Sequence, residues 1–173
     1  MRVHTQSLVN GKMGGRAQQE RVGHDRSALA AATPAEVRRL IRAGEWRAHT
    51  VGLCLGFAQA NLVIVPGDVS DDFLLFCKRN PKPCPVLEVM DRGSTFTRVL
   101  ASSADVRTDL PLYRIYEDGK LVAEVEEITG YWRDDLMAVL IGCSYTFDHA
   151  LHEAGIPLRH LREGRNVPMF VTN

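Results

Sequence analysis

The segment 112–126 contains the clearest β-hairpin in the sequence, and it constrains the fold more than any other feature. Two stretches with apolar and β-branched residues flank the pair Asp118-Gly119. An Asp-Gly pair between two such stretches is typical of a two-residue hairpin turn. The sequence therefore predicts antiparallel strands here, and we expect them to form the centre of a small lobe, residues 94–130.

Helix and strand patterns are mixed along the rest of the chain. Thr33, Pro34 and Glu36 match a capping box, which predicts a helix that Gly44 ends. We also expect strands over 60–65 and 86–90, and a helix opened by Ser70 with Phe73, Phe76 and Cys77 on its apolar face. Two more helices are expected, over 132–141 and 147–154; the last three residues of the first also fit a strand. The predicted fold is mixed α/β (α+β): a sheet with packed helices in a main domain, residues 27–93 and 131–173, beside the hairpin lobe.

The composition limits the classes of protein that the chain can represent. With 173 residues, 45% of them hydrophobic, the chain can bury a real core. Lys+Arg and Asp+Glu number 21 each, and this balance argues against a nucleic-acid-binding protein. The longest apolar runs fall short of the roughly 18 residues that a membrane-spanning helix needs, so no membrane association is expected.

The polar segment 1–26 is expected to be a disordered leader; a mis-called start and a weak organellar presequence are the alternatives. It lacks the apolar core of a secretory signal peptide. The four cysteines are then expected to remain thiols in a reducing compartment. We expect the cytoplasm, or the mitochondrial matrix if the protein is eukaryotic.

A corner of small residues, Gly142-Cys143-Ser144, lies between an apolar segment and an amphipathic one. A helix that starts at such a corner has N–H groups without intrahelical partners, and these groups bind anions readily. The backbone N–H groups of Gly142, Cys143 and Ser144 are therefore candidates for holding a substrate carboxylate or the oxyanion, and Gly142 is a candidate substrate-binding residue. Cys143 and Ser144 are candidate catalytic residues. The Cys143 thiol could donate a proton or act as a nucleophile through a thioester. The alternative is that the corner only caps and packs a turn.

The segment 80–85 has three prolines in six residues, so it cannot be a helix or a central strand. We expect a stiff, extended connector that holds Asn80 and Lys82 as substrate-binding groups and Cys84 as a catalytic thiol. The alternative is a turn with Cys84 buried. A single pocket would require 80–84 to lie close to 142–144.

Other polar side chains have less specific signals. Gln59 and Asn61 flank the start of a strand, where either substrate binding or loop bonding would explain them. Arg38 and Arg42 are expected on the solvated face of the first helix. No metal site is expected, because the sequence has neither Cys-x-x-Cys nor His-Glu-x-x-His.

Four segments in this order carry a resemblance to a known family: Gln59 to Pro66, Phe73 to Pro85, Gly142 to Asp148, and Val167 to Asn173. They closely resemble the D-glutamate cyclase family, whose bacterial members are labelled hydro-lyases. The resemblance covers roughly residues 33–173 and is to the front part of the family pattern, since family members continue past the last segment. It implies a lyase that removes water, joining the amine of glutamate to its side-chain carboxyl to give 5-oxoproline.

The implied reaction sets demands on a site. Two carboxylates must be held, an oxyanion stabilised and a leaving hydroxide protonated, while holding one folded conformer brings the reacting groups together. No metal or organic cofactor is required, and a small acidic substrate is the expected partner. The alternative is a non-catalytic domain that binds small carboxylates, or a truncated inactive family member. Apolar surface exposed by truncation could drive self-association, so a homo-oligomer stays open.

Overall fold

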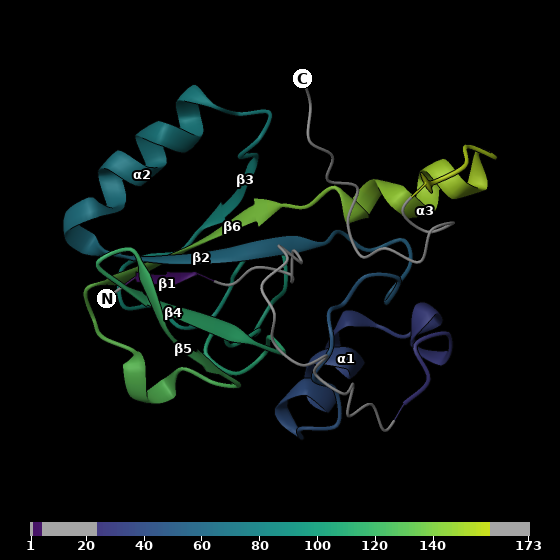
Figure 1. The fold of residues 1–173 in the computed structure, drawn as a ribbon, viewed down its shortest axis with the longest axis horizontal. Helices are drawn as coiled ribbons and strands as arrows, with labels where there is room; N and C mark the ends of the chain where they lie inside the picture. Colours follow the sequence, from purple (N-terminus) through teal and green to yellow (C-terminus); the bar gives the residue numbers. More distant parts are fainter. Residues whose placement is uncertain (1, 5–23, 160–173) are drawn as a thin grey trace.

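The computed structural model describes residues 2–4 and 24–159, which form one six-stranded sheet with three α-helices (Figure 1). The strand order is β3-β6-β2-β1-β4-β5, and all neighbouring strands run antiparallel. The strands are β1 Arg2–His4, β2 Ala60–Pro66, β3 Val86–Val89, β4 Tyr113–Glu117, β5 Lys120–Val125 and β6 Leu136–Gly142. The α-helices are α1 Pro34–Arg42, α2 Gly67–Arg79 and α3 Tyr145–Glu153, with 3-10 turns at Ala28–Ala31 and Thr129–Tyr131. The predicted mixed α/β fold is confirmed.

The sheet buries apolar side chains on both of its faces. Because successive strand residues point to opposite faces, Leu62 and Ile64 of β2 join one core cluster while Val63 and Val65 join another. The second cluster lies beneath α2, which covers one face of the sheet (Figure 1). A third cluster packs α1 against Trp46, which is fully buried.

The predicted helix over 132–141 is wrong, because most of this segment forms the strand β6. β6 pairs with β2 over seven residue pairs and with β3 on its other side. Its run Leu136 to Val139 is buried on both faces of the sheet. A strand covered on both faces needs no polar alternation, so its sequence resembles that of a buried helix.

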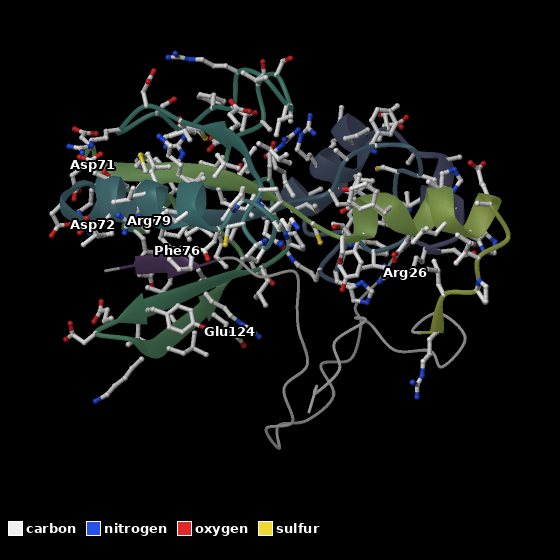
Figure 2. All side chains as sticks on the ribbon, turned by 90° about the horizontal axis from the view of Figure 1, so that it is seen from above. Arg26, Asp71, Asp72, Phe76, Arg79 and Glu124 are labelled. Atoms are coloured by element: carbon white, nitrogen blue, oxygen red, sulfur yellow. The ribbon has the colours of Figure 1, made fainter. Side chains whose placement is uncertain are left out.

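The helix α2 begins earlier than predicted. It starts at Gly67, directly after β2, and Ser70 lies inside it with its hydroxyl donating to the carbonyl of Gly67 at 2.8 Å. The apolar face also differs from the prediction, because Cys77 is buried but the Phe76 side chain is 54% exposed on the helix surface (Figure 2).

Two local predictions are confirmed. Thr33 and Glu36 form the predicted capping box at the start of α1. Asp118 and Gly119 have φ of 47° and 76°, the left-handed backbone of the expected hairpin turn between β4 and β5.

The hairpin belongs to the same sheet as β2 and β6, because β1 pairs with β2 on one side and β4 on the other. The division into a main domain and a hairpin lobe stays a prediction. Of the predicted leader, Arg2–His4 form β1, residues 24–26 are also placed, and residues 5–23 lie outside the described part. Within the described ranges, no helix has the length and apolar character required to cross a membrane.

Candidate functional site

The predicted site segments meet at one end of the sheet. In the antiparallel ladders, the start of β2 and the start of β3 both lie beside the end of β6, from which the chain continues into α3 (Figure 1). The N–H of Gly142 donates to the carbonyl of Pro85 at 2.8 Å, and the N–H of Cys143 donates to the carbonyl of Gln59 at 3.1 Å. The corner 142–144 is therefore adjacent to the proline-rich segment, as a single pocket would require.

The same hydrogen bonds change the chemistry expected of the corner. Of the three backbone amides expected to bind an anion, those of Gly142 and Cys143 are already paired with carbonyl groups of the fold. An anion would have to displace these bonds, so we correct the role predicted for these amides. Ser144 is exposed and its side chain makes no capping hydrogen bond to α3.

Cys143 is a partly buried thiol at the start of α3. Burial raises its pKa, while hydrogen bonds from the Tyr145 N–H, the Asn61 side chain and the Ser144 N–H act in the opposite direction without cancelling the rise. A thiol with a raised pKa stays protonated at neutral pH, which favours proton donation over nucleophilic attack. The fold thus brings together two predicted site residues, Asn61 and Cys143.

Gln59 connects three parts of the structure. Its side-chain oxygen accepts from the Thr50 hydroxyl at 2.9 Å, and its side-chain nitrogen donates to the carbonyl of Leu53 at 3.2 Å. Its backbone N–H donates to the Thr146 hydroxyl at 2.9 Å. Gln59 therefore makes the hydrogen bonds to a loop that were expected as the alternative to substrate binding.

The segment 80–85 forms a compact turn instead of an extended connector. The Cys84 N–H donates to the carbonyl of Asn80 at 3.0 Å, and the Asn80 side chain caps the end of α2 by donating to the carbonyl of Phe76 at 2.8 Å. Lys82 is exposed, and Cys84 packs beneath α2 against the core. The prolines still restrict the backbone, but here they hold a turn rather than an extended strip.

A cavity of about 210 Å³ lies between α1, the loop 47–54, the start of β2 and the loop 109–112. Gln59 and Asn61 are the predicted site residues that line it; Gly142, Cys143, Ser144, Asn80, Lys82 and Cys84 are not among its lining residues. The polar groups in its wall that sequence reasoning did not select are Arg38, Arg47, His49, Thr50 and Asp109. The cavity is small beside the roughly 300–1,000 Å³ of typical ligand pockets, which favours a small metabolite.

Asp109 organises the charged side of this cavity. Its carboxylate, 2% exposed, lies 2.7 Å from Nη1 of Arg42 and 3.4 Å from Nε of Arg38. Its oxygens also accept from the Asp105 N–H and the Thr108 hydroxyl. The expected solvated face is wrong for Arg38, which is only 20% exposed, whereas Arg42 is 45% exposed. Both arginines of α1 pair with a buried acid 67 or more residues away.

The loop that forms another wall is held by Arg26, labelled in Figure 2. Its Nη1 donates to the carbonyls of His49 at 2.9 Å and Val51 at 2.6 Å, and its guanidinium lies 5.0 Å from the ring centroid of Trp46. Trp46 Nε1 also donates to the carbonyl of Ala48, so Arg26 and Trp46 both hold this loop. Arg26, which was expected to belong to a disordered leader, thus holds a loop that lines the cavity.

Comparison with known proteins gives the family context of this geometry. Residues 137–173 match the family model described as D-glutamate cyclase. The chain is 54% identical over 145 residues to a "Putative hydro-lyase" of Psychrobacter arcticus, an alignment that covers 84% of this chain and 55% of the relative. The predicted resemblance to the D-glutamate cyclase family is confirmed.

Two other relatives with the same description have similar identity to this chain. Identity is 58% over 139 residues with a protein of the same description from Rubrobacter xylanophilus, covering 80% of this chain and 54% of that protein. Identity is 56% over 140 residues with a protein of the same description from Thermoanaerobacter sp., covering 81% of this chain and 53% of that protein. The chain spans about half the length of the curated relatives it matches.

Three of the four segments that carry the family resemblance have a described structure. Residues 59–66 form β2 with the residue before it, and residues 73–85 form the C-terminal half of α2 and the proline turn. Residues 142–148 form the corner with the start of α3. The fourth segment, 167–173, lies outside the described residues. The described segments of the D-glutamate cyclase pattern therefore include both the end of the sheet and one wall of the cavity.

Proposed function

We propose that this chain provides a substrate pocket of a hydro-lyase that closes glutamate into 5-oxoproline, and that the cavity between α1 and the start of β2 binds the substrate. The family match supports the reaction class. The cavity supports a small acidic ligand, because Arg38 and Arg47 line it together with hydrogen-bonding groups and with Asp109, the carboxylate that pairs with Arg38. The presence of a cationic side chain within a small, largely apolar cavity is the observation that carries the proposal.

The reaction joins two ends of one molecule. The glutamate ammonium loses one proton before its nitrogen attacks the side-chain carboxyl carbon and a second proton after the C–N bond has formed. One oxygen of that carboxylate takes up two protons in the same course and leaves as water when its C–O bond breaks. The α-carboxylate takes no part in these bond changes. It needs only a cation, and a fixed conformer supplies much of the rate advantage.

Arg38 is the residue that we assign to the substrate carboxylate. Its Nε faces Asp109 at 3.4 Å, which fixes the guanidinium in the cavity wall, and the side chain is only 20% exposed. Arg47 is a weaker choice, because its Nη2 lies 2.7 Å from Glu126 and its Nη1 donates to the carbonyl of Ile41. A planar, pre-positioned guanidinium suits a carboxylate better than a mobile cation does.

Asn61 and Cys143 are assigned to the reacting end. Asn61 lines the cavity and also contacts the Cys143 sulfur, so its amide is a suitable donor for a developing oxyanion. Cys143 lies one side chain away from the cavity. As a thiol that stays protonated, it is the proposed source of the proton for the leaving hydroxide.

The direct test is incubation of the protein with D- and L-glutamate while 5-oxoproline is followed by chromatography. The matched variants are Arg38→Gln and Arg39→Gln, because Arg39 is the exposed neighbour on the same helix. Loss of a charged hydrogen bond of about 1.5–3 kcal/mol corresponds to a roughly 10- to 100-fold weaker interaction. We expect that loss for Arg38→Gln and unchanged behaviour for Arg39→Gln.

Thermal-shift measurements with 5-oxoproline and dicarboxylates separate the alternatives. Stabilisation that Arg38→Gln abolishes, without turnover, would refute the lyase reaction for this chain and support a carboxylate-binding domain. A folded protein that neither turns over glutamate nor is stabilised by these acids would refute both the reaction and the assigned pocket.

A further inference from the structure

Two cysteines outside the cavity lie close together at the end of α2. Cys77 is in the last turn of the helix and Cys84 closes the proline-rich turn that follows it. Successive backbone hydrogen bonds link them, from the Asn80 N–H to the carbonyl of Cys77 at 3.1 Å and from the Cys84 N–H to the carbonyl of Asn80 at 3.0 Å. The chain therefore folds back on itself between the two thiols.

The two side chains contact each other in the same apolar cluster beneath α2. Cys77 is 1% exposed and belongs to this cluster, and the partly buried Cys84 packs against it. Burial raises the pKa of Cys77, and a hydrogen bond between the two thiols adds to the rise. The thiols thus differ in access: solvent reaches Cys84 and hardly reaches Cys77.

We propose that Cys77 and Cys84 form a reversible intramolecular disulfide when the protein meets a peroxide, with Cys84 as the thiol that reacts first and Cys77 as the thiol that resolves it. Contact between the sulfurs is the geometric requirement, because a disulfide must bring them to about 2.05 Å. The proline-restricted turn holds Cys84 against the helix before any oxidant arrives, which lowers the entropy lost on closing the bond.

The chemistry balances with hydrogen peroxide as the oxidant. The Cys84 sulfur, as thiolate, attacks one peroxide oxygen; the O–O bond breaks, leaving a sulfenic acid on Cys84 and releasing water after protonation. The Cys77 sulfur then attacks the Cys84 sulfur, forming the S–S bond and expelling the sulfenic hydroxyl as a second water. Two thiols are oxidised to one disulfide and one peroxide is reduced to two waters.

The positions of basic residues make this bond easy to detect. Lys78 and Arg79 lie between the two cysteines, so trypsin separates them into different peptides. After mild peroxide treatment, alkylation of the remaining thiols and tryptic digestion, we expect the peptide that ends at Lys78 to stay joined to the peptide that starts at Asn80. The first of these peptides also contains Cys54, so fragmentation must place the alkyl group on Cys54 and the bond on Cys77. Dithiothreitol before alkylation should abolish this joined species.

Single variants define the order of the two steps. Cys77→Ser should leave a sulfenic acid at Cys84 that dimedone traps, whereas Cys84→Ser should lose both the trapped adduct and the joined peptides. Cys54→Ser and Cys143→Ser are the controls, because Cys54 belongs to a different core cluster and Cys143 contacts Asn61 instead. Both should form the 77–84 bond at the level of the unmodified chain.

Two results would overturn the proposal. One is over-oxidation of Cys84 to sulfinic or sulfonic acid in the unmodified chain with no joined peptides, which would mean that Cys77 cannot reach it. The other is a joined species that pairs Cys84 with Cys54 or Cys143. Neither readout depends on glutamate turnover, so the proposal is tested independently of the function proposed above.

Discussion

Replacement of Asp109 by asparagine tests the central charged contact of the cavity. The Asp109 carboxylate is 2% exposed, pairs with Arg42 and Arg38, and accepts from the Asp105 N–H and the Thr108 hydroxyl. An asparagine side chain would keep the shape of the carboxylate, but it would lose the negative charge and turn an N–H donor toward at least one of these donors. The substitution therefore removes an ion pair and leaves cationic groups facing a neutral amide.

The size of the effect follows from burial. Removing one partner of a buried ion pair typically costs about 3–5 kcal/mol. Here the Arg42 side chain is 45% exposed and can be rehydrated, so we expect a smaller loss of about 2–3 kcal/mol. For a chain of 173 residues, this loss corresponds to a fall in Tm of roughly 5–10 °C.

Urea denaturation and calorimetry of Asp109→Asn measure this loss, with Asp91→Asn as the control. Asp91 lies 2.8 Å from Arg98, but both side chains are more than 70% exposed, so its substitution should change the free energy of unfolding by less than about 0.5 kcal/mol. A double-mutant cycle with Arg42→Met should show a coupling energy of about 1 kcal/mol or more. If Asp109→Asn is as stable as the control, the ion pair does not hold the cavity wall and the role given to Asp109 is refuted.

Two further substitutions probe the rest of the fold. Gly67→Ala should cost about 1–3 kcal/mol, because a Cβ there would lie 2.9 Å from the backbone oxygen of Asp135, whereas Gly130→Ala meets nothing within 4 Å and should be nearly neutral in the same urea series. Burial acts to raise the pKa of Glu88, but N–H hydrogen bonds from residues 98–100 outweigh it and the pKa lies below its usual 4.5. The stability from these bonds is thus present above pH 4.5 and lost as the pH falls through the lowered pKa, so Glu88→Gln should flatten the acid side of the stability profile; an unchanged slope would contradict this account.

Elements that are specified by a few adjacent residues were predictable from the sequence. The capping box at Thr33 and the Asp118-Gly119 turn each depend on a few adjacent residues, so the pattern alone specifies their geometry. The strand β2 was also predictable, because it is short and apolar and ends at Pro66.

The strand β6 and the start of α2 were not predictable in the same way. In β6, burial on both faces removes the alternation that distinguishes a strand from a buried helix. The helix α2 begins on Gly67, where the backbone of Asp135 approaches too closely for a side chain, and this tertiary contact cannot be recognised in the local sequence pattern.

The candidate site was predictable in part. Gln59 and Asn61 were selected as polar residues at a strand start, and both line the cavity. Arg38 and Asp109 were missed, because their contact joins a helix to a loop distant in sequence, and each looks like an ordinary surface charge on its own. A single pocket required the proline-rich segment to lie close to the corner 142–144, but the sequence pattern did not show how. The antiparallel pairing of β3 with β6 brings Pro85 beside Gly142.

The position of β1 has a consequence for the order of folding. Residues 2–4 separate β2 from β4, so the middle of the sheet joins the beginning of the chain to segments about 60 and 110 residues later. During synthesis, this strand emerges before both of its neighbours and cannot obtain the second one until Tyr113–Glu117 has left the ribosome. Pairings over such long sequence separations form slowly, so the seam between the two parts of the sheet should be among the last contacts to appear.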